Sequence, residues 1–221
     1  MTRDQPQRPE PMADFFDRRA DGYDEHMREN VEAFDAFYGA VAAAVPETDE
    51  PLEILDLGVG TGLELPAVLA RAPNARITGI DVSPKMLTRL RLRLADRVDR
   101  VRLLQASFLE TEFGEGVDDV VLSTMALHHW PSETKLALYR RICDALRPGG
   151  QFINGDYILA DGAQDPLPTF PGASSGENAE LVHVDLPLPL EVEERLLADA
   201  GFTTVRTAFR TSRAAVLVAT R

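Results

Sequence analysis

The sequence of 221 residues predicts an α/β fold class: a doubly wound, mostly parallel seven-stranded sheet with helices on both faces, a C-terminal antiparallel hairpin and an N-terminal helical cap. Three observations predict this architecture. Short apolar runs alternate with segments of helical periodicity, as in βαβ units. A glycine-rich turn joins the first run to a helix, and two strand-like runs close the chain. Strands are expected at residues 52–57, 76–80, 101–104, 117–123 and 152–153, and in a hairpin at 202–209 and 214–219.

The chain is expected to form a single domain over residues 12–221, a length that suits one complete α/β core. Residues 1–11 are polar and proline-rich and are expected to be a disordered tail. Residues 12–46 have helical periodicity and are expected to form the cap. The proline-, glycine- and serine-rich stretch 157–186 is expected to be a lid-like loop, because long loops in compact domains are usually functional or mobile.

Two helices outside the glycine-rich turn have clear signals. In the cap, apolar residues at three- and four-residue spacing predict one long helix from Val31 to about Val45. Ser83 followed by Pro84 is typical of a helix start, and the apolar stripe that follows favours a helix over a strand. The basic residues of this second helix are expected to form a solvated face: Arg89, Arg91, Arg93 and Arg97.

The sequence ILDLGVGTG at residues 54–62 indicates a nucleotide-type binding turn. Its glycines allow a sharp bend and the close approach of a ligand, and the helix from about Leu63 to Arg71 offers unpaired amides at its N-terminus. Asp81 ends the next strand, where a carboxylate is placed to accept both hydroxyls of a ribose. The alternative is a glycine-rich turn that binds no ligand, and the placement of Asp56 and Asp81 around it would then be coincidental.

The spacing of this turn argues against a dinucleotide. The pattern is D-x-G-x-G-x-G rather than G-x-G-x-x-G, and it begins with the acid Asp56. A carboxylate there would repel a pyrophosphate but could receive an ammonium group. The sequence therefore favours a nucleoside that carries an amino acid.

These residues resemble motif I of the class I, seven-stranded Rossmann-like S-adenosylmethionine-dependent methyltransferases, small-molecule type. Three further segments are similar to the same family: the F-D-x-x-A-x-x-Y-D pattern at residues 16–24, the strand and L-H-H sequel at 119–130, and the L-R-P-G-G turn at 146–150. The resemblance extends from Phe16 to Ala219. It implies S-adenosyl-L-methionine as cofactor and S-adenosyl-L-homocysteine as product.

The resemblance also implies a set of cofactor-binding residues. The loop Gly58 to Gly60 would hold the amino-acid end, Asp81 the ribose, and Ser107 with Phe108 the adenine, Ser107 standing where the family usually has Asp. Met86 would pack on adenine or be a plain core residue. The full set of cofactor-binding residues is Asp56, Gly58, Val59, Gly60, Gly62, Asp81, Val82, Met86, Ser107, Phe108, Ser123 and Tyr23.

Four residues are candidates for the catalytic, acceptor-binding side: Tyr23, His128, His183 and Asp185. His183 and Asp185 are two apart on an extended segment and would point to one side; solvated polar residues on an edge strand are the alternative. Tyr23 could instead be a helix-packing residue, and His128 could order its loop. No metal is expected, because adjacent histidines should point apart and no acidic residue has the spacing of a metal ligand.

The predicted reaction is methyl transfer to a small-molecule acceptor by in-line displacement, with catalysis coming mainly from proximity and orientation. Two alternatives stay open: a cofactor-binding regulator without methyl transfer, and an enzyme that modifies S-adenosylmethionine itself. An NAD-dependent oxidoreductase is disfavoured, because neither of the two lysines, Lys85 and Lys135, is placed for hydride chemistry.

Composition restricts the partners and the compartment. The net charge of −13 argues against a nucleic-acid surface, and no apolar run is long enough to span a membrane. The N-terminus has no apolar segment typical of a secretory signal, and the single cysteine, Cys143, cannot form an internal disulfide. A cytoplasmic protein is expected, and a homodimer is compatible with the sequence.

Overall fold

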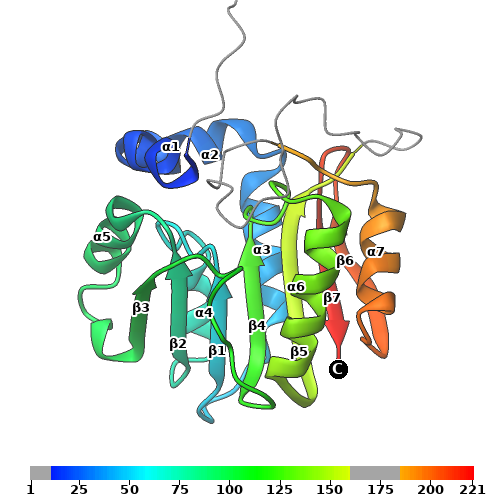
Figure 1. Ribbon diagram of the computed structural model, residues 1–221. Coiled ribbons are helices and arrows are strands. Elements are labelled where there is room, and N and C mark those ends of the chain that lie inside the picture. Colours follow the sequence, from blue (N-terminus) through cyan, green and yellow to red (C-terminus); the bar gives the residue numbers. More distant parts are fainter. Residues whose placement is uncertain (1–10, 160–184) are drawn as a thin grey trace, which may run out of the picture.

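The computed structural model describes residues 11–159 and 185–221, and within them a seven-stranded sheet confirms the predicted fold class (Figure 1). The strand order is β3-β2-β1-β4-β5-β7-β6. Strands β1 to β5 pair in parallel, whereas β7 is antiparallel to both β5 and β6. The strands are β1 Glu53–Leu57, β2 Arg76–Asp81, β3 Val101–Gln105, β4 Asp118–Thr124, β5 Leu146–Tyr157, β6 Thr204–Arg210 and β7 Ala214–Thr220.

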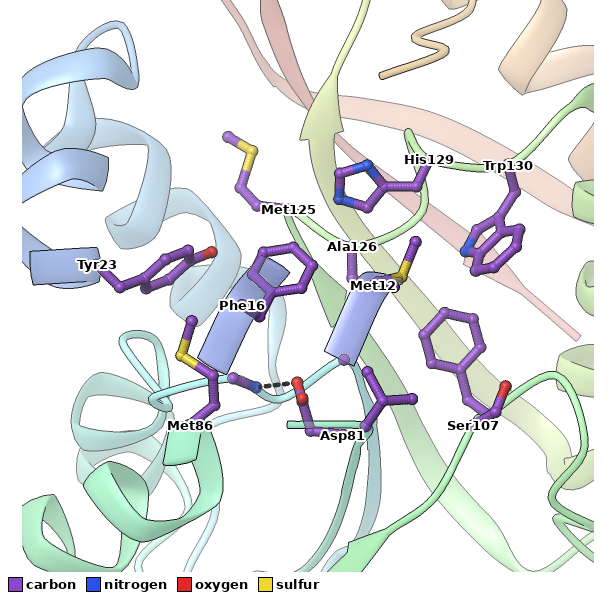
Figure 2. A pocket seen from close by; sticks show the side chains of 14 residues that line it. Met12, Phe16, Tyr23, Asp81, Met86, Ser107, Met125, Ala126, His129 and Trp130 are labelled. Atoms are coloured by element: carbon purple, nitrogen blue, oxygen red, sulfur yellow. Dashed lines mark hydrogen bonds between the residues drawn. The ribbon is translucent and has the colours of Figure 1, made fainter. Parts of the chain in front are cut away.

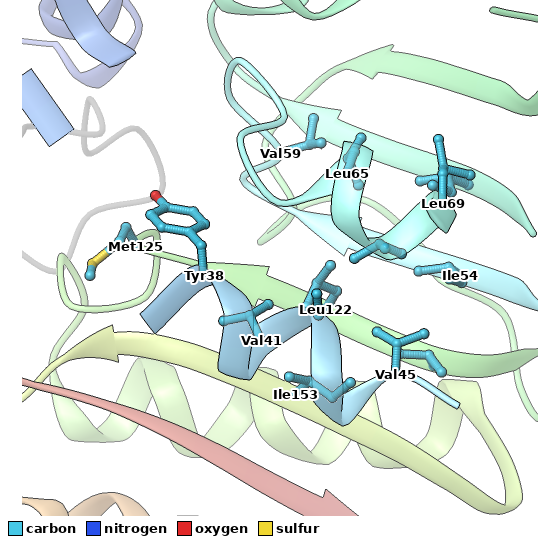
Figure 3. Close-up of a cluster of buried hydrophobic side chains, with 14 of the residues drawn as sticks. Tyr38, Val41, Val45, Ile54, Val59, Leu65, Leu69, Leu122, Met125 and Ile153 are labelled. Atoms are coloured by element: carbon cyan, nitrogen blue, oxygen red, sulfur yellow. The ribbon is translucent and has the colours of Figure 1, made fainter. Parts of the chain in front are cut away.

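Helices cover both faces of the sheet because side chains alternate between the two faces along each strand. Ile54, Leu122 and Ile153 lie in the cluster beneath α3, α4 and α5 (Figure 3), whereas Leu55 and Val121 lie in the cluster beneath α6 and α7. The helices are α1 Met12–Arg19, η1 Ala20–Gly22, α2 Tyr23–Asn30, α3 Phe34–Ala44, α4 Leu65–Arg71, α5 Pro84–Arg93, η2 Val98–Arg100, α6 Ser132–Ala145 and α7 Leu190–Asp199. Within the described residues, no helix is long and apolar enough to cross a bilayer.

The cap helix predicted from Val31 to about Val45 is present as α3, but it begins three residues later than expected, at Phe34. Helix α2 ends at Asn30, Val31 is extended, and Ala33 has a left-handed backbone with φ of 53° before α3 begins. The break lets α1 and α2 lie across the strand ends while α3 runs along the sheet (Figure 1). Val31 is buried although it lies in the turn between α2 and α3, so its apolar side chain fits the spacing of α3 without belonging to that helix.

Two of the arginines expected on a solvated face of α5 form ion pairs with the cap. Arg89 donates a hydrogen bond of 2.6 Å to Asp21, and Arg93 forms an ion pair with Asp24. Both acids belong to the cap. Ser83, which caps α5 as predicted, also donates its hydroxyl to Asp17 of α1 at 2.5 Å. These contacts hold the cap over the carboxyl ends of β1 and β2, although exposed ion pairs of this kind contribute little individually.

Candidate functional site

A cavity with about 540 Å³ of empty space, including its opening, lies between the cap and the carboxyl ends of β1, β2 and β4 (Figure 2). A crevice at this edge of the sheet is where open α/β folds bind ligands. The lining residues include eight of the predicted cofactor-binding residues: Tyr23, Gly58, Gly60, Asp81, Val82, Met86, Ser107 and Phe108. The other lining residues are Met12, Phe16, Met125, Ala126, His129 and Trp130.

The glycine-rich turn forms the floor of this cavity. Gly58 has φ of +73°, and a Cβ there would lie 2.4 Å from the Cβ of Ala126. The amide of Gly58 donates to the carbonyl of Ile80 at 2.9 Å, which fixes the turn against β2. Only glycine therefore fits this position, and the backbone stays accessible from the cavity.

Asp81 presents its carboxylate to the cavity with both oxygens anchored. One oxygen accepts from the amide of Gly60 at 2.9 Å and the other from the amide of Ser83 at 2.8 Å. Each carboxylate oxygen has a further lone pair available, so the group can also accept two hydroxyls. Burial raises the pKa of Asp81 to about 6, against the lowering effect of these amides, and the group is mainly ionised at neutral pH.

Four predicted cofactor-binding residues do not line the cavity: Asp56, Val59, Gly62 and Ser123. Val59 is buried in the core, and a Cβ on Gly62 would lie 3.0 Å from the Cγ of Leu90. Ser123 is fully buried and donates its hydroxyl to the carbonyl of Leu57 at 2.8 Å. Val59, Gly62 and Ser123 therefore support the turn from the side away from the cavity. They do so through core packing and a hydrogen bond to β1.

Asp56 lies behind the turn and faces a second acid, Glu64, which the sequence analysis missed. Asp56 is fully buried, and neither of its carboxylate oxygens has a hydrogen-bond partner among the described residues. Burial and the neighbouring charge of Glu64 raise the pKa of Asp56 well above its usual range, and burial raises that of Glu64 to about 7. A proton or a cation near these two carboxylates would relieve their repulsion.

Glu64→Gln is expected to remove a loss of stability at high pH. The pKa of Glu64 is about 7 in the folded protein and 4.5 as its ordinary value. A raised pKa means that this group's contribution to stability is complete below pH 4.5 and is lost as the pH rises through 7. The free energy of unfolding of the variant, measured in urea and compared with that of the parent, should be on the order of 3 kcal/mol larger at pH 8 than at pH 5. Equal pH dependence of the two proteins would contradict the assignment.

A second cavity adjoins the first and has about 1350 Å³ of empty space, including its opening. The two share four lining residues: Phe16, Tyr23, Met125 and His129. Its other walls include the cap helices and the carboxyl ends of β4 and β5, where His128, Tyr157 and Asp185 lie. A ligand in the first cavity would thus adjoin a second ligand across a common wall.

His128 is held by a carboxylate that the sequence analysis did not identify. Its Nδ1 lies 2.5 Å from Oδ1 of Asp156, and Asp156 also accepts from the amides of Leu127 at 2.9 Å and Tyr157 at 2.8 Å. Burial alone would lower the pKa of His128, but the charge of Asp156 and hydrogen bonds to Asp156 and Asp185 raise it to about 9. The position of Asp156 at the carboxyl end of β5, the edge of the sheet where ligands bind, was the sequence signal that could have identified it.

The expectation that His128 and His129 point apart without an acidic partner is wrong. Their ring centroids are 4.0 Å apart, and Oδ1 of Asp185 lies 3.5 Å from Nε2 of His128 and 3.2 Å from Nδ1 of His129. Hydrogen bonds to the two histidines hold the pKa of Asp185 well below its usual range. The loop after β4 that carries both histidines turns through Met125, which has a positive φ of 54°.

Three further predictions lie partly or wholly outside the described residues. His183 is among residues 160–184, and so is most of the predicted lid at 157–186; residues 1–10 of the predicted tail are outside as well.

Tyr23 lies at the common wall of the two cavities, where burial raises the pKa of its phenol. It is therefore a neutral hydrogen-bonding group at physiological pH.

The first cavity fits an amino-acid-bearing nucleoside. The indole Nε1 of Trp130 is buried and has no partner among the described residues, and Trp130 lines the cavity on the same side as Ser107 (Figure 2). It offers an unused donor to a base, beside an anchored carboxylate for a ribose at Asp81. Met86 and Phe108 supply apolar walls. The fold and the cavity together define a nucleoside-binding protein of the Rossmann-like α/β class.

Comparison with known proteins identifies the family. A methyltransferase domain model matches residues 54–150. The chain is 31% identical over 157 residues to an uncharacterized methyltransferase of Synechocystis, covering 70% of this chain and 68% of the relative. It is 25% identical to the crystal structure of a putative O-methyltransferase from Nostoc punctiforme, with a TM-score of 0.71, covering 96% of this chain and 62% of that one. The chain belongs to the class I S-adenosylmethionine-dependent methyltransferase family of enzymes, whose cofactor is S-adenosylmethionine.

Two relatives differ in their reactions and in how much of their length is matched. Erythromycin 3''-O-methyltransferase of Saccharopolyspora erythraea is 31% identical over 173 residues, covering 75% of this chain but 54% of the relative. Carboxy-S-adenosyl-L-methionine synthase of Wolinella succinogenes is 26% identical over 222 residues, covering 92% of each. The chain thus spans about half the length of the first relative and most of the second.

Proposed function

We propose that this chain transfers the methyl group of S-adenosylmethionine to a small-molecule acceptor held in the second cavity. The observation that carries the proposal is the common wall of the two cavities, formed by Phe16, Tyr23, Met125 and His129. It would place an acceptor next to the cofactor. The net charge of −13 favours a small acceptor over a nucleic acid.

The first cavity would hold the cofactor through residues with separate tasks. Asp81 would accept the ribose hydroxyls, and Ser107, Phe108 and Trp130 would surround the adenine. The backbone from Gly58 to Gly60 would bind the amino-acid end, with the two buried acids behind it favouring an ammonium group nearby. When bound, S-adenosylmethionine supplies a methyl group on a positively charged sulfur, which keeps the electron pair of the bond that breaks.

The chain's contribution to the reaction would be alignment and exclusion of water. Phe16 and Tyr23 of the cap form part of the common wall and would restrict the approach of solvent to the reactants. Orienting two reactants in this way can account for a large part of the rate enhancement. On the acceptor side, His128 is held in place by Asp156. His128 and Asp185 would contact the acceptor.

Filling the second cavity should abolish transfer without affecting the cofactor. Gly22 lines this cavity, and a Cβ at Gly22 would meet no atom within 4 Å, so the side chain of Gly22→Trp would begin in open space. We expect Gly22→Trp to lower methyl transfer about tenfold or more, through occupation of acceptor space, while S-adenosylhomocysteine affinity stays unchanged. Mass spectrometry of products from a panel of small hydroxyl, amine and thiol acceptors, with tRNA included, measures transfer.

Gly39→Trp is the matched control, because Gly39 lies on α3 outside both cavities and has equally open surroundings. It should behave as the parent. Methylation of tRNA alone, or equal loss in both variants, would contradict the proposal. Binding of S-adenosylhomocysteine without transfer to any acceptor would favour a regulator.

A second candidate function is modification of S-adenosylmethionine itself, which is favoured by the 92% mutual coverage with the carboxy-S-adenosyl-L-methionine synthase of Wolinella succinogenes. Mass spectrometry of the ligand that co-purifies with the protein tests it. A ligand heavier than S-adenosylmethionine by a carboxylate would support this candidate over methyl transfer.

A further inference from the structure

Three side chains capable of binding a metal converge at the inner wall of the second cavity. They are His128 and His129, from the loop after β4, and Asp185, from the segment that precedes α7. One potential ligand atom from each lies within 4.8 Å of the other two. Both imidazoles are almost completely buried, whereas the side chain of Asp185 is 63% exposed and lies on the cavity side.

The distances between these atoms suit a shared cation. Oδ1 of Asp185 is 3.2 Å from Nδ1 of His129 and 3.5 Å from Nε2 of His128. Ligands of a tetrahedral zinc ion with bonds of 2.0–2.1 Å are about 3.3 Å apart, so both separations match the edges of such a polyhedron. The third separation, between the two imidazole nitrogens, is within 4.8 Å.

The support around His128 is of the kind that metal-binding histidines have. Its Nδ1 is paired with Asp156, so its Nε2 faces Asp185 and the cavity. Asp156 is itself oriented by the backbone amides of Leu127 and Tyr157. A carboxylate on the far nitrogen fixes the tautomer and direction of a ligating imidazole, and such partners affect metal affinity about 10–100-fold.

We propose that His128, His129 and Asp185 bind one divalent transition-metal cation, of the zinc, manganese or iron(II) class, at the wall of the acceptor cavity. Two imidazole nitrogens favour such cations over magnesium or calcium, which prefer oxygen ligands. Three protein ligands leave at least one coordination position open, and all three ligands line the second cavity. Resting on the proposed methyl transfer, this position would take an oxygen atom of the acceptor, so the fitting substrates carry an oxygen donor beside the methylated group.

Metal titration of the untagged, chelator-treated protein tests the site directly. Isothermal titration with zinc and manganese chloride, followed by elemental analysis after gel filtration, should give one ion per chain. His129→Gln and Asp185→Asn should each weaken binding about tenfold or more, and Asp156→Asn should weaken it through loss of orientation of His128. Asp185 is substantially exposed, so Asp185→Asn should leave thermal stability largely intact.

His26→Gln is the matched control, since His26 lines the same cavity outside the cluster and should leave metal binding unchanged. No ion bound by the parent, or equal binding by the parent and Asp185→Asn, would overturn the metal site and leave an ordinary His–Asp ion pair. S-adenosylhomocysteine binding, measured on the same metal-free protein, tests the cofactor site separately. Loss of metal binding with retained cofactor binding would thus reject only this inference.

Discussion

Asp81→Ala is expected to weaken S-adenosylmethionine binding about 100-fold. The substitution removes a carboxylate that lines the first cavity and is held between the amides of Gly60 and Ser83. Hydrogen bonds to a charged group contribute about 1.5–3 kcal/mol each, so the loss of two ribose contacts amounts to roughly 3 kcal/mol or more. A tenfold change in affinity corresponds to about 1.4 kcal/mol, which gives the expected factor. Isothermal titration with S-adenosylhomocysteine measures it.

Two variants separate this effect from damage to the fold. Asp81→Asn keeps the shape and one acceptor oxygen, so it should lose less affinity than Asp81→Ala. Asp99→Ala alters an exposed acid on η2, outside the cavity, and should bind as the parent does. Unchanged affinity in Asp81→Ala, with its melting temperature also unchanged, would show that this carboxylate does not hold the ribose.

Glu193→Ala is expected to destabilise the protein by about 3–5 kcal/mol, because it leaves the buried ammonium of Lys135 without its partner. Lys135 on α6 is fully buried and forms an ion pair with Glu193 on α7. Glu193 also accepts a hydrogen bond of 2.6 Å from the hydroxyl of Tyr139. Urea unfolding of parent and variant measures the difference.

The double variant Lys135→Met, Glu193→Leu should recover much of this stability, since apolar residues of similar volume often replace buried ion pairs without net loss. Tyr139→Phe is the control for the single hydrogen bond and should cost about 1 kcal/mol. If Glu193→Ala and the double variant lose equal stability, packing rather than the uncompensated charge explains the effect.

Local sequence signals predicted the parts of this site that a few consecutive residues determine. Gly58 needs a positive φ and an open approach, and Asp81 ends a strand beside it, so both could be placed from spacing alone. Ser83 likewise caps α5 with its own hydroxyl, as its position before Pro84 indicated. The mostly parallel sheet was indicated by the alternation of short apolar runs with helices, and the terminal hairpin by two strand-like runs joined by a short connection.

Contacts between distant segments could not be predicted in the same way. Asp156 is 28 positions from His128, and Glu193 is 58 positions from Lys135, so only the folded sheet brings each pair together. The break at Ala33 has no glycine or proline to mark it; it is required by the change in direction between the cap and α3. The partners of Arg89 and Arg93 lie in the cap, which periodicity within α5 does not reveal.

Calorimetric titration of the purified chain with S-adenosylmethionine, S-adenosylhomocysteine and NAD is the direct test of whether the cavity beside Gly58 and Asp81 is a site for S-adenosylmethionine. We expect one binding site per chain for each of the two sulfur nucleosides and none for NAD. A saturating nucleoside at 100 times its Kd should also add about 2.7 kcal/mol to the free energy of unfolding. Binding of NAD, or of none of the three ligands, would contradict the assignment of this cavity to S-adenosylmethionine.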